Sequence, residues 1–574
     1  MAVIVDSTPM TSLRPAAFAM LLLSVSVQPH RAHAQDNAPA PADHVIGEQT
    51  NPAETATTTS SPVNDATAFA KRIRTLLSAP NVASAHWGIA VTAMDGTPIY
   101  GLDEAKLFHP ASTLKLFTTA AALEILGPNA TVTTKLTGDL DATSGILTGD
   151  LILTGAGDPS FNTNDLPYRR SAPDTTAGDD LAAFADQLVA KGLHRVTGDI
   201  LGNDSLLSHE PAPDGWAAED LLWGYGALPS ALSVSDNELR LTITPGTMPS
   251  SADPALEIST RIDIEQLAPY LSVENAVHTV PAATAMQRGT GLVAVADRPE
   301  TLKAFGVLTA GSAPVIEHVA IPEPAHYAAE ALKQLLIARG VVIEGKAAAF
   351  HAVTEPTEAY LTAWRRPDSF DEAPGGLRGY SSSCGSAAFS QHLLATKVSA
   401  PLQEEITFTL KTSANLHAEL LLRRLGLQNS CPGSSSVNGA RLIRSDLVHA
   451  GLTPGDFVFY DGSGLSTKDL VTPRAEAQLL AYAARQPWFA QWKAALPVGG
   501  IDGTLASRFT QAPLKGHVFA KTGTLGESRA LAGYVQCRSG REVIFTILVD
   551  NHQPGSTADR TAMDAIVAAI AAAN

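Results

Sequence analysis

The stretch HPASTLKLFTTAAALEILG (residues 109–127) reads as an apolar helix that opens with a proline, a serine and a lysine. Pro110 suits the first turn of a helix, where a missing N–H costs nothing. Ser112 and Lys115 stand three residues apart, so their side chains lie on one helix face. Because a lysine is costly on the buried face of a helix, the position of Lys115 needs a chemical explanation.

A serine hydroxyl is a weak nucleophile until a base takes its proton, and a buried lysine with a lowered pKa can be that base. Free N–H groups at the helix start would also favour negative charge that develops at Ser112. The alternative is chance, because Ser-x-x-Lys arises about once or twice in a chain of this length on ordinary composition. Taken alone, the pair favours chance, so other motifs must decide.

A second short motif lies near the C-terminus, in FAKTGTLGESRALAGYV (residues 519–535). Lys521, Thr522 and Gly523 fall on a predicted strand there. A glycine lets the backbone of a ligand lie against a strand edge. Lys521 and the Thr522 hydroxyl could hold a substrate carboxylate. Serine enzymes of the penicillin-binding type combine these two motifs with a third, Ser-Asp-Asn.

Two places compete for this middle motif. The literal Ser235-Asp236-Asn237 leads into an alternating strand, and we interpret it as a turn. Ser413-Ala414-Asn415 stands in the strong helical pattern of LQEEITFTLKTSANLHAELLLRRLG (residues 402–426). We favour Ser413 and Asn415, because a second serine and an amide in that part of the chain could face Lys115 and the substrate.

In this order the motifs resemble those of the low-molecular-mass class C penicillin-binding proteins. These are D-alanyl-D-alanine carboxypeptidases and endopeptidases of bacterial cell walls. GDLILTGAGDPSF, VTGDILGNDSLL, FVFYDGSGLS and LPVGGIDGTLASRF also look like family blocks in family order. The resemblance covers residues 68–352 and 398–574, and it departs from the family pattern at Ala414, where Asp is common.

The resemblance implies the chemistry of a serine DD-peptidase. Ser112 would attack the carbonyl of the penultimate D-alanine and form an acyl-enzyme. Lys115, kept neutral by burial and by nearby Lys521, would be the base. Ser413 would relay a proton to the leaving amine, and Asn415 would position the substrate.

The resemblance also implies how the substrate is held. The backbone N–H groups of Ser112 and Thr524 would form the oxyanion hole. Lys521 and Thr522, next to Gly523, would bind the substrate carboxylate. The expected partners are peptidoglycan stem peptides and β-lactam antibiotics as acylating inhibitors. Neither a metal nor an organic cofactor is implied.

The predicted fold is α+β. We expect a catalytic domain of the serine DD-peptidase/β-lactamase type, with an antiparallel sheet flanked by helices, split by a large β-rich insertion. The predicted segments are a signal peptide (1–34), a disordered linker (35–66), the first catalytic part (67–132), two nested β-rich domains (133–352), an irregular insertion (353–397) and the second catalytic part (398–574).

The N-terminus predicts export. Arg14 precedes an apolar stretch over 16–27, and Ala32-His33-Ala34 fits a small-x-small cleavage site. The alternative is a disordered tail with a chance apolar run. The apolar stretch is too short to span a bilayer. We expect a soluble periplasmic protein with at most loose membrane association.

Composition excludes several function classes. The net charge is −17 and no long run of Lys or Arg occurs, which argues against nucleic-acid binding. Cys384, Cys431 and Cys537 allow at most one disulfide, and their spacing is not that of a zinc site. HExxH and Gly-x-Ser-x-Gly are both absent from the sequence.

Other polar residues receive structural interpretations. We expect Asp461-Gly462-Ser463-Gly464 to be a tight turn, and residues 155–160 to be a loop without a phosphate-binding role. His417 is expected to be exposed on its helix. Two rival functions stay open: a β-lactamase, against which the chain length weighs, and a non-catalytic cell-wall scaffold, against which the presence of Ser112, Lys115 and Lys521 weighs.

Overall fold

The computed structural model describes residues 68–163, 165–170, 178–210, 212–247, 258–282, 289–295, 298–352, 392–428 and 436–574. The predicted signal peptide and linker, most of the predicted irregular insertion, and both Cys384 and Cys431 lie outside the described residues. Cys537 is buried as a free thiol. Within the described ranges, no helix has the length and apolar character needed to cross a membrane.

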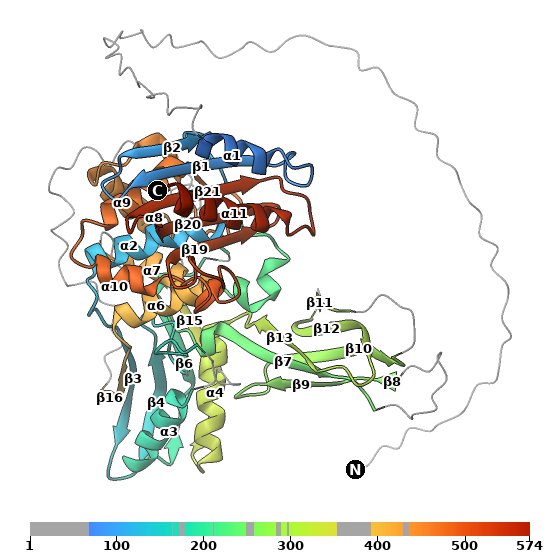
Figure 1. The fold of residues 1–574 in the computed structure, drawn as a ribbon. Helices are drawn as coiled ribbons and strands as arrows, with labels where there is room; N and C mark the ends of the chain where they lie inside the picture. Colours follow the sequence, from blue (N-terminus) through green and yellow to red (C-terminus); the bar gives the residue numbers. More distant parts are fainter. Residues whose placement is uncertain are drawn as a thin grey trace, which may run out of the picture. The chain divides into compact units, whose positions relative to one another are not determined.

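The segments that we predict to be catalytic share a five-stranded antiparallel sheet in the order β19-β20-β21-β1-β2 (Figure 1). Its strands are β1 (His86–Ala93), β2 (Pro98–Leu102), β19 (Val518–Leu525), β20 (Ser528–Gln536) and β21 (Glu542–Asp550). Seven consecutive residues of β21 are buried, because helices cover both faces of the sheet. Strands from residues 86–102 and from residues 518–550 therefore form one sheet.

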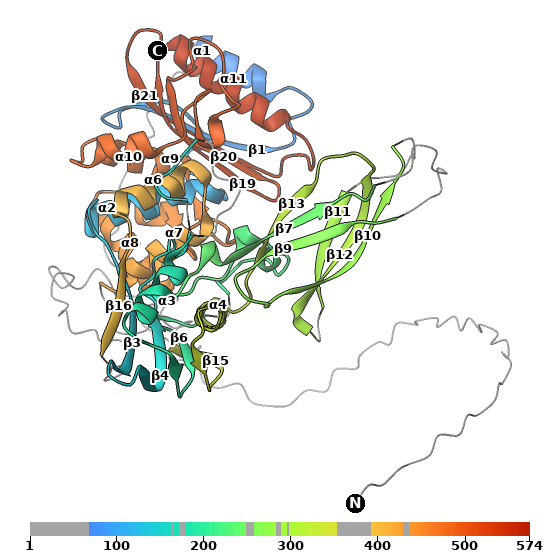
Figure 2. The same cartoon turned by 90° about the horizontal axis from the view of Figure 1, so that it is seen from below.

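Two groups of helices cover this sheet (Figure 2). On one face, α1 (Ala68–Leu77) and the alanine-rich α11 (Ala558–Ala573) share a core with the strands. On the other face lie α2, α6, α7, α8, α9 and α10. Their bounds are Lys115–Ile125, Leu402–Thr412, Asn415–Gly426, Ser436–His449, Pro473–Ala483 and Phe489–Ala495. The two-strand ladder of β17 (Phe457–Val458) and β18 (Leu470–Val471) joins this second group.

The insertion after α2 forms a seven-stranded mixed sheet. Its main path is β14-β5-β4-β3-β16, and β6 pairs with both β4 and β15. The strands are β3 (Thr133–Asp141), β4 (Ile146–Thr154), β5 (Arg195–Val196), β6 (Ile200–Ser208), β14 (Val342–Ile343), β15 (Ala347–Ala352) and β16 (Leu393–Val398). Helices α3 (Asp180–Ala190) and α4 (Pro324–Ala338) pack on it through a shared apolar core.

Two smaller sheets are nested between β6 and α4. One has the order β13-β7-β9, and the other has the order β11-β12-β10-β8. The strands are β7 (Glu238–Thr244), β8 (Ile258–Ser259), β9 (Arg261–Glu265), β10 (Ser272–Val280), β11 (Gly289–Val295), β12 (Arg298–Thr309) and β13 (Val315–Ala320). A 3₁₀ turn, η4 (Ser235–Asn237), leads into β7, which agrees with the predicted turn.

Two sequence interpretations need correction here. The helical pattern over 402–426 is two helices, because the backbone of Ser413 is left-handed (φ +68°) and separates α6 from α7. The predicted irregular insertion is wrong for its last residues, since Leu393–Val398 is the strand β16. This strand pairs with β3, and the pairing across 256 or more residues left no local signal.

Candidate active site

Ser112 lies in a tight turn that glycines make possible. The 3₁₀ turn η1 (Ala111–Leu114) runs directly into α2, so Ser112 lies one turn before the predicted helix becomes regular. Ala111 has a left-handed backbone (φ +47°). A Cβ on Gly464 would come within 1.8 Å of the Ala111 carbonyl oxygen, and one on Gly523 within 2.7 Å of the Pro110 carbonyl oxygen. Two backbone segments from the end of the chain therefore hold the Ser112 turn closely.

The Lys115 amine contacts three oxygen atoms. Its Nζ lies 2.9 Å from Ser112 Oγ, 2.6 Å from Asn415 Oδ1 and 2.7 Å from the Ser463 carbonyl oxygen. The amide and carbonyl oxygens can only accept hydrogen bonds. A neutral amine would give them its two N–H groups, and its lone pair would then face the hydroxyl proton of Ser112.

Burial allows the Lys115 amine to lose its proton near neutral pH. Lys115 is fully buried, and this burial lowers its pKa to about 7. The charges of Asp461, Glu419 and Asp469 oppose the shift. Burial of the charged form is thus the dominant effect at Lys115.

Ser413 and Lys521 form the second half of the site. Lys521 Nζ donates to Ser413 Oγ at 2.8 Å and to the Thr522 carbonyl oxygen at 2.7 Å. Lys521 is also fully buried, and burial together with the charge of Lys115 lowers its pKa well below the ordinary value. Burial is the main cause of the lowered pKa at both lysines, and the charge of Lys115 adds to it at Lys521.

The Lys-Thr-Gly segment lies on β19, the edge strand of the catalytic sheet. The Thr522 hydroxyl is partly accessible and donates to Thr504 Oγ1 at 2.8 Å. Thr524 is exposed on the same strand. An edge strand keeps backbone N–H and C=O groups that no neighbouring strand uses, so this edge can receive an extended peptide.

The loop after β17 contacts the Lys115 amine through the Ser463 carbonyl oxygen. Asp461 accepts from the backbone N–H groups of Ser463, Gly464 and Ser466 at 2.6–3.0 Å. It also accepts from Trp216 Nε1 at 2.8 Å, which ties the insertion to this loop. The predicted turn is present, but it does more than reverse the chain, because its Ser463 carbonyl oxygen holds the Lys115 amine.

Glu419 is a buried site residue that the sequence interpretation missed. Its Oε1 accepts from the Gly462 N–H at 2.7 Å, and its Oε2 pairs with Arg423 at 2.6 Å. Burial, followed by the charge of Asp461, raises the pKa of Glu419 to about 7. Glu419 stands four residues after Asn415 on α7, and this shared helix face is the signal that could have found it.

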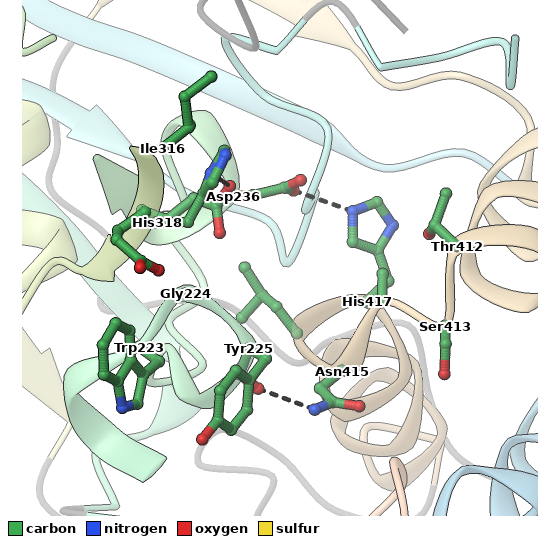
Figure 3. A pocket seen from close by; sticks show the side chains of 14 residues that line it. Trp223, Gly224, Tyr225, Asp236, Ile316, His318, Thr412, Ser413, Asn415 and His417 are labelled. Atoms are coloured by element: carbon green, nitrogen blue, oxygen red, sulfur yellow. Dashed lines mark hydrogen bonds and ion pairs between the residues drawn. The ribbon is translucent and has the colours of Figure 1, made fainter. Parts of the chain in front are cut away.

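A cavity of about 520 Å³ opens beside Ser413 and Asn415 (Figure 3). Asn415 Nδ2 donates to the Tyr225 carbonyl oxygen at 2.8 Å, so the insertion takes part in orienting this amide. The cavity lies between the start of α7 and the nested region, and its lining includes Trp223, Tyr225, Asp236, His318, Ser413 and His417. The sequence interpretation did not include Tyr225, which is distant along the chain.

The expectation that His417 is exposed is wrong. Only 1% of this residue is accessible, and its Nε2 lies 2.9 Å from Asp236 Oδ1 (Figure 3). The apolar neighbours on α7 gave no hint of a carboxylate partner from the insertion. Asp236 thereby faces the active-site cavity even though Ser235 and Asn237 are buried structural residues.

Comparisons with known proteins show the family to which the chain is similar. The model of the D-Ala-D-Ala carboxypeptidase 3 (S13) family matches residues 69–362 and 383–573. A D-alanyl-D-alanine carboxypeptidase of Actinomadura sp. (strain R39) is 30% identical over 495 residues, which cover 84% of this chain and 80% of the relative.

Solved structures show the same fold. Penicillin-binding protein 4 of Haemophilus influenzae superposes with a TM-score of 0.68 at 21% identity, covering 86% of this chain and 97% of that one. The same Haemophilus protein, solved in complex with a β-lactam, superposes with a TM-score of 0.63 at 21% identity, covering 87% and 97% of the two chains. The α+β fold of the serine DD-peptidases is thereby confirmed.

Proposed function

The chain belongs to the D-Ala-D-Ala carboxypeptidase 3 (S13) family and is a penicillin-binding serine DD-peptidase, and we propose that Ser112 is its acylated nucleophile. The observation that carries this assignment is the contact of Lys115 Nζ with Ser112 Oγ at 2.9 Å, in a buried site where the pKa of Lys115 is about 7. A base poised near the working pH is suited to proton transfer in both directions.

Acylation begins when the neutral Lys115 amine takes the Ser112 proton. The Ser112 oxygen attacks the carbonyl carbon of the penultimate D-alanine, and that carbonyl oxygen becomes negative. The backbone N–H groups of Ser112 and Thr524 stabilise this oxyanion. The bond from carbon to nitrogen then breaks, and the leaving D-alanine amine takes up a proton through the Ser413 hydroxyl.

Lys521 and Thr522 hold the terminal carboxylate of the substrate beside Gly523. An anion placed against the buried Lys521 amine favours its charged form and opposes the lowering of its pKa. The charged Lys521 in turn orients the Ser413 hydroxyl, to which it already donates at 2.8 Å. Asn415 holds the other end of the site, between Lys115 and Tyr225. Water then attacks the acyl-enzyme and regenerates Ser112.

The test is intact-protein mass spectrometry after incubation with benzylpenicillin. The wild type should gain one covalent adduct, and Ser112→Ala should gain none. Ser235→Ala is a matched control, because it removes a serine hydroxyl outside the proposed machinery and should keep the adduct. An adduct that persists in Ser112→Ala would contradict the assignment of the nucleophile.

The lifetime of the adduct separates two related enzymes. A slowly cleared adduct fits a DD-peptidase, whereas clearance within seconds would indicate a β-lactamase. The natural reaction follows from two substrates: release of D-alanine from a pentapeptide reports carboxypeptidase activity, and cleavage of a cross-linked dimer reports endopeptidase activity. We propose stem peptides as the substrate in either reaction.

We also propose that the enzyme acts in the periplasm after removal of residues 1–34. The support is the order of Arg14, the apolar stretch and Ala32-His33-Ala34 in the sequence. Mass spectrometry of the protein from a periplasmic extract should find an N-terminus at Gln35. A full-length chain retained in the cytoplasmic fraction would contradict this proposal.

A further inference from the structure

A group of metal-binding side chains lies outside the active site, in the seven-stranded sheet. Asp204 belongs to β6, His209 follows this strand, and His351 belongs to β15. One ligand atom of each lies within 4.8 Å of the others. The parallel register of β6 and β15, with Ala352 opposite Ser208, brings the two histidines together.

The contacts of His351 leave a position for a cation. Its Nδ1 lies 2.8 Å from Asp204 Oδ1, and its Nε2 lies 3.5 Å from Glu323 Oε1. A neutral imidazole carries only one N–H, so it cannot donate to both carboxylates. A neutral ring that donates its Nδ1–H to Asp204 has no proton left for Glu323, whereas a metal ion at Nδ1 would leave the Nε2–H to face Glu323.

The surroundings favour a divalent cation. Asp204 is buried, with 5% of the residue accessible, and its Oδ2 accepts from Ser230 Oγ at 2.9 Å. The ring of His209 lies 4.2 Å from that of His351, centre to centre. With both imidazoles neutral, the two carboxylates of Asp204 and Glu323 leave the group with two negative charges, which a divalent ion would balance.

We propose that Asp204, His209 and His351 bind one Zn²⁺ ion. Neutral imidazole and carboxylate groups are zinc ligands, and three protein ligands leave a fourth position for water. Glu323 would orient His351 through Nε2, and Ser230 would orient Asp204, as outer partners do in zinc sites. His209 is exposed, which leaves an entry path for the ion.

Binding exchanges a proton for the metal. Zn²⁺ takes the place of the Nδ1 proton of His351, and that proton leaves to solvent. The same ion would join β6 to β15. Glu210, which directly follows His209, pairs with Arg423 of helix α7 at 2.8 Å. We expect the ion to stabilise this junction without entering the reaction.

The test is calorimetric titration of ZnCl₂ into full-length protein that has been treated with EDTA and dialysed. We expect one Zn²⁺ per chain and a rise in the melting temperature of about 5 °C at saturation. His209→Ala and His351→Ala should each weaken binding by about tenfold or more. His194→Ala is the matched control, because it removes an exposed histidine of the same inserted region and should bind as the wild type does.

Acylation by benzylpenicillin shows whether each variant is folded. Because acylation reports on the active site and the titration reports on the zinc site, failure of one proposal can be told from failure of the other. Zinc binding that is absent from the wild type, or equal in the wild type and both variants, would overturn the site. Co²⁺ titration into the wild type is a second measurement that needs no variant. Intense visible bands of a four-coordinate ion support the site, and the pale spectrum of a hydrated ion contradicts it.

Discussion

Two Ser-x-Asn triplets contribute to one cavity and differ in almost everything else. Ser413-Ala414-Asn415 presents its serine to Lys521 and its amide to Lys115. Ser235-Asp236-Asn237 turns its serine and amide into the insertion and presents only Asp236 to the cavity. Both triplets contain left-handed backbone, so local strain does not tell them apart.

The difference lies in what surrounds each serine. Ser235 Oγ bonds to Asn162, whose backbone oxygen and side chain belong to a loop of the insertion. Ser413 Oγ accepts a hydrogen bond from the buried Lys521 amine, whose pKa is lowered by burial and by the charge of Lys115. A serine becomes useful to catalysis only where a neighbour can move its proton, and the surrounding elements determine which serine has such a neighbour.

The largest difference should appear when each serine is removed. Ser413→Ala should lower kcat/KM for a D-Ala-D-Ala peptide by about 10²–10⁴-fold, the usual contribution of a positioned proton-transfer group. Ser235→Ala should change it by less than about threefold, because Ser235 contacts no proposed catalytic group. Steady-state kinetics on both variants test this. Similar losses in the two variants would erase the distinction between the triplets.

The two asparagines should differ in the kind of damage they cause. Asn415→Ala should slow acylation by about 10–100-fold, since the Lys115 amine loses an oriented acceptor. Asn237 is buried and bonds to Val234, Leu228 and Ser233, so Asn237→Ala should lower the free energy of unfolding by about 1–3 kcal/mol. Stopped-flow acylation and denaturant unfolding separate the two effects. A large stability loss with normal acylation in Asn415→Ala would count against its role.

The pH dependence sharpens the role of Asn415 further. Below the Lys115 pKa of about 7 the amine is protonated and cannot take the Ser112 proton. Acylation by benzylpenicillin should therefore fall by about tenfold for each pH unit below that value. Asn415→Asp places a carboxylate against the amine and raises the pKa of Lys115. The pH below which the acylation rate falls should therefore rise by about one unit. If the acylation rate of this variant falls at the same pH as that of the wild type, another group controls the rate.

The smallest effect is expected at the contact between Asp236, of the first triplet in the chain, and His417, which lies two residues after the second triplet. Burial works against the charged His417 ring, while Asp236 raises its pKa above the ordinary value. A raised pKa in the folded state stabilises the protein below about pH 6.5, and this stability is lost as the pH rises through the folded value.

Asp236→Asn should accordingly lower the free energy of unfolding by about 1–2 kcal/mol at pH 5.5, and by less at pH 9. Asp165 also makes the stability loss smaller at pH 9. Burial and then the charge of Asp236 raise the pKa of Asp165 to about 7, so at pH 9 Asp165 is ionised and repels Asp236. Asp236→Asn removes this repulsion. Thermal unfolding of both proteins at the two pH values measures this. A larger loss at pH 9 would reverse the assigned sign.

The sequence predicted candidate reactive residues where short motifs carry them. Ser112 with Lys115, and Lys521 with Thr522, are close neighbours in the chain, so spacing alone places each pair on one face or strand. Tyr225 and Asp204 gave no such signal. Tyr225 contacts Asn415 across 190 residues, and Asp204 contacts His351 across 147. His417 was misinterpreted for the same reason, since its carboxylate partner comes from the insertion.

The amino-acid sequence by itself determined the α+β class, and it predicted the interrupted catalytic domain and the choice of Ser413 over Ser235. These rest on periodicity, motif order and chain segments, which are local or one-dimensional properties. Only the tertiary structure decided the state of Lys115. Its lowered pKa comes from complete burial, opposed by Asp461, Glu419 and Asp469, which fold around it from distant segments. Desolvation depends on everything that excludes water from a site, and no stretch of sequence contains that information.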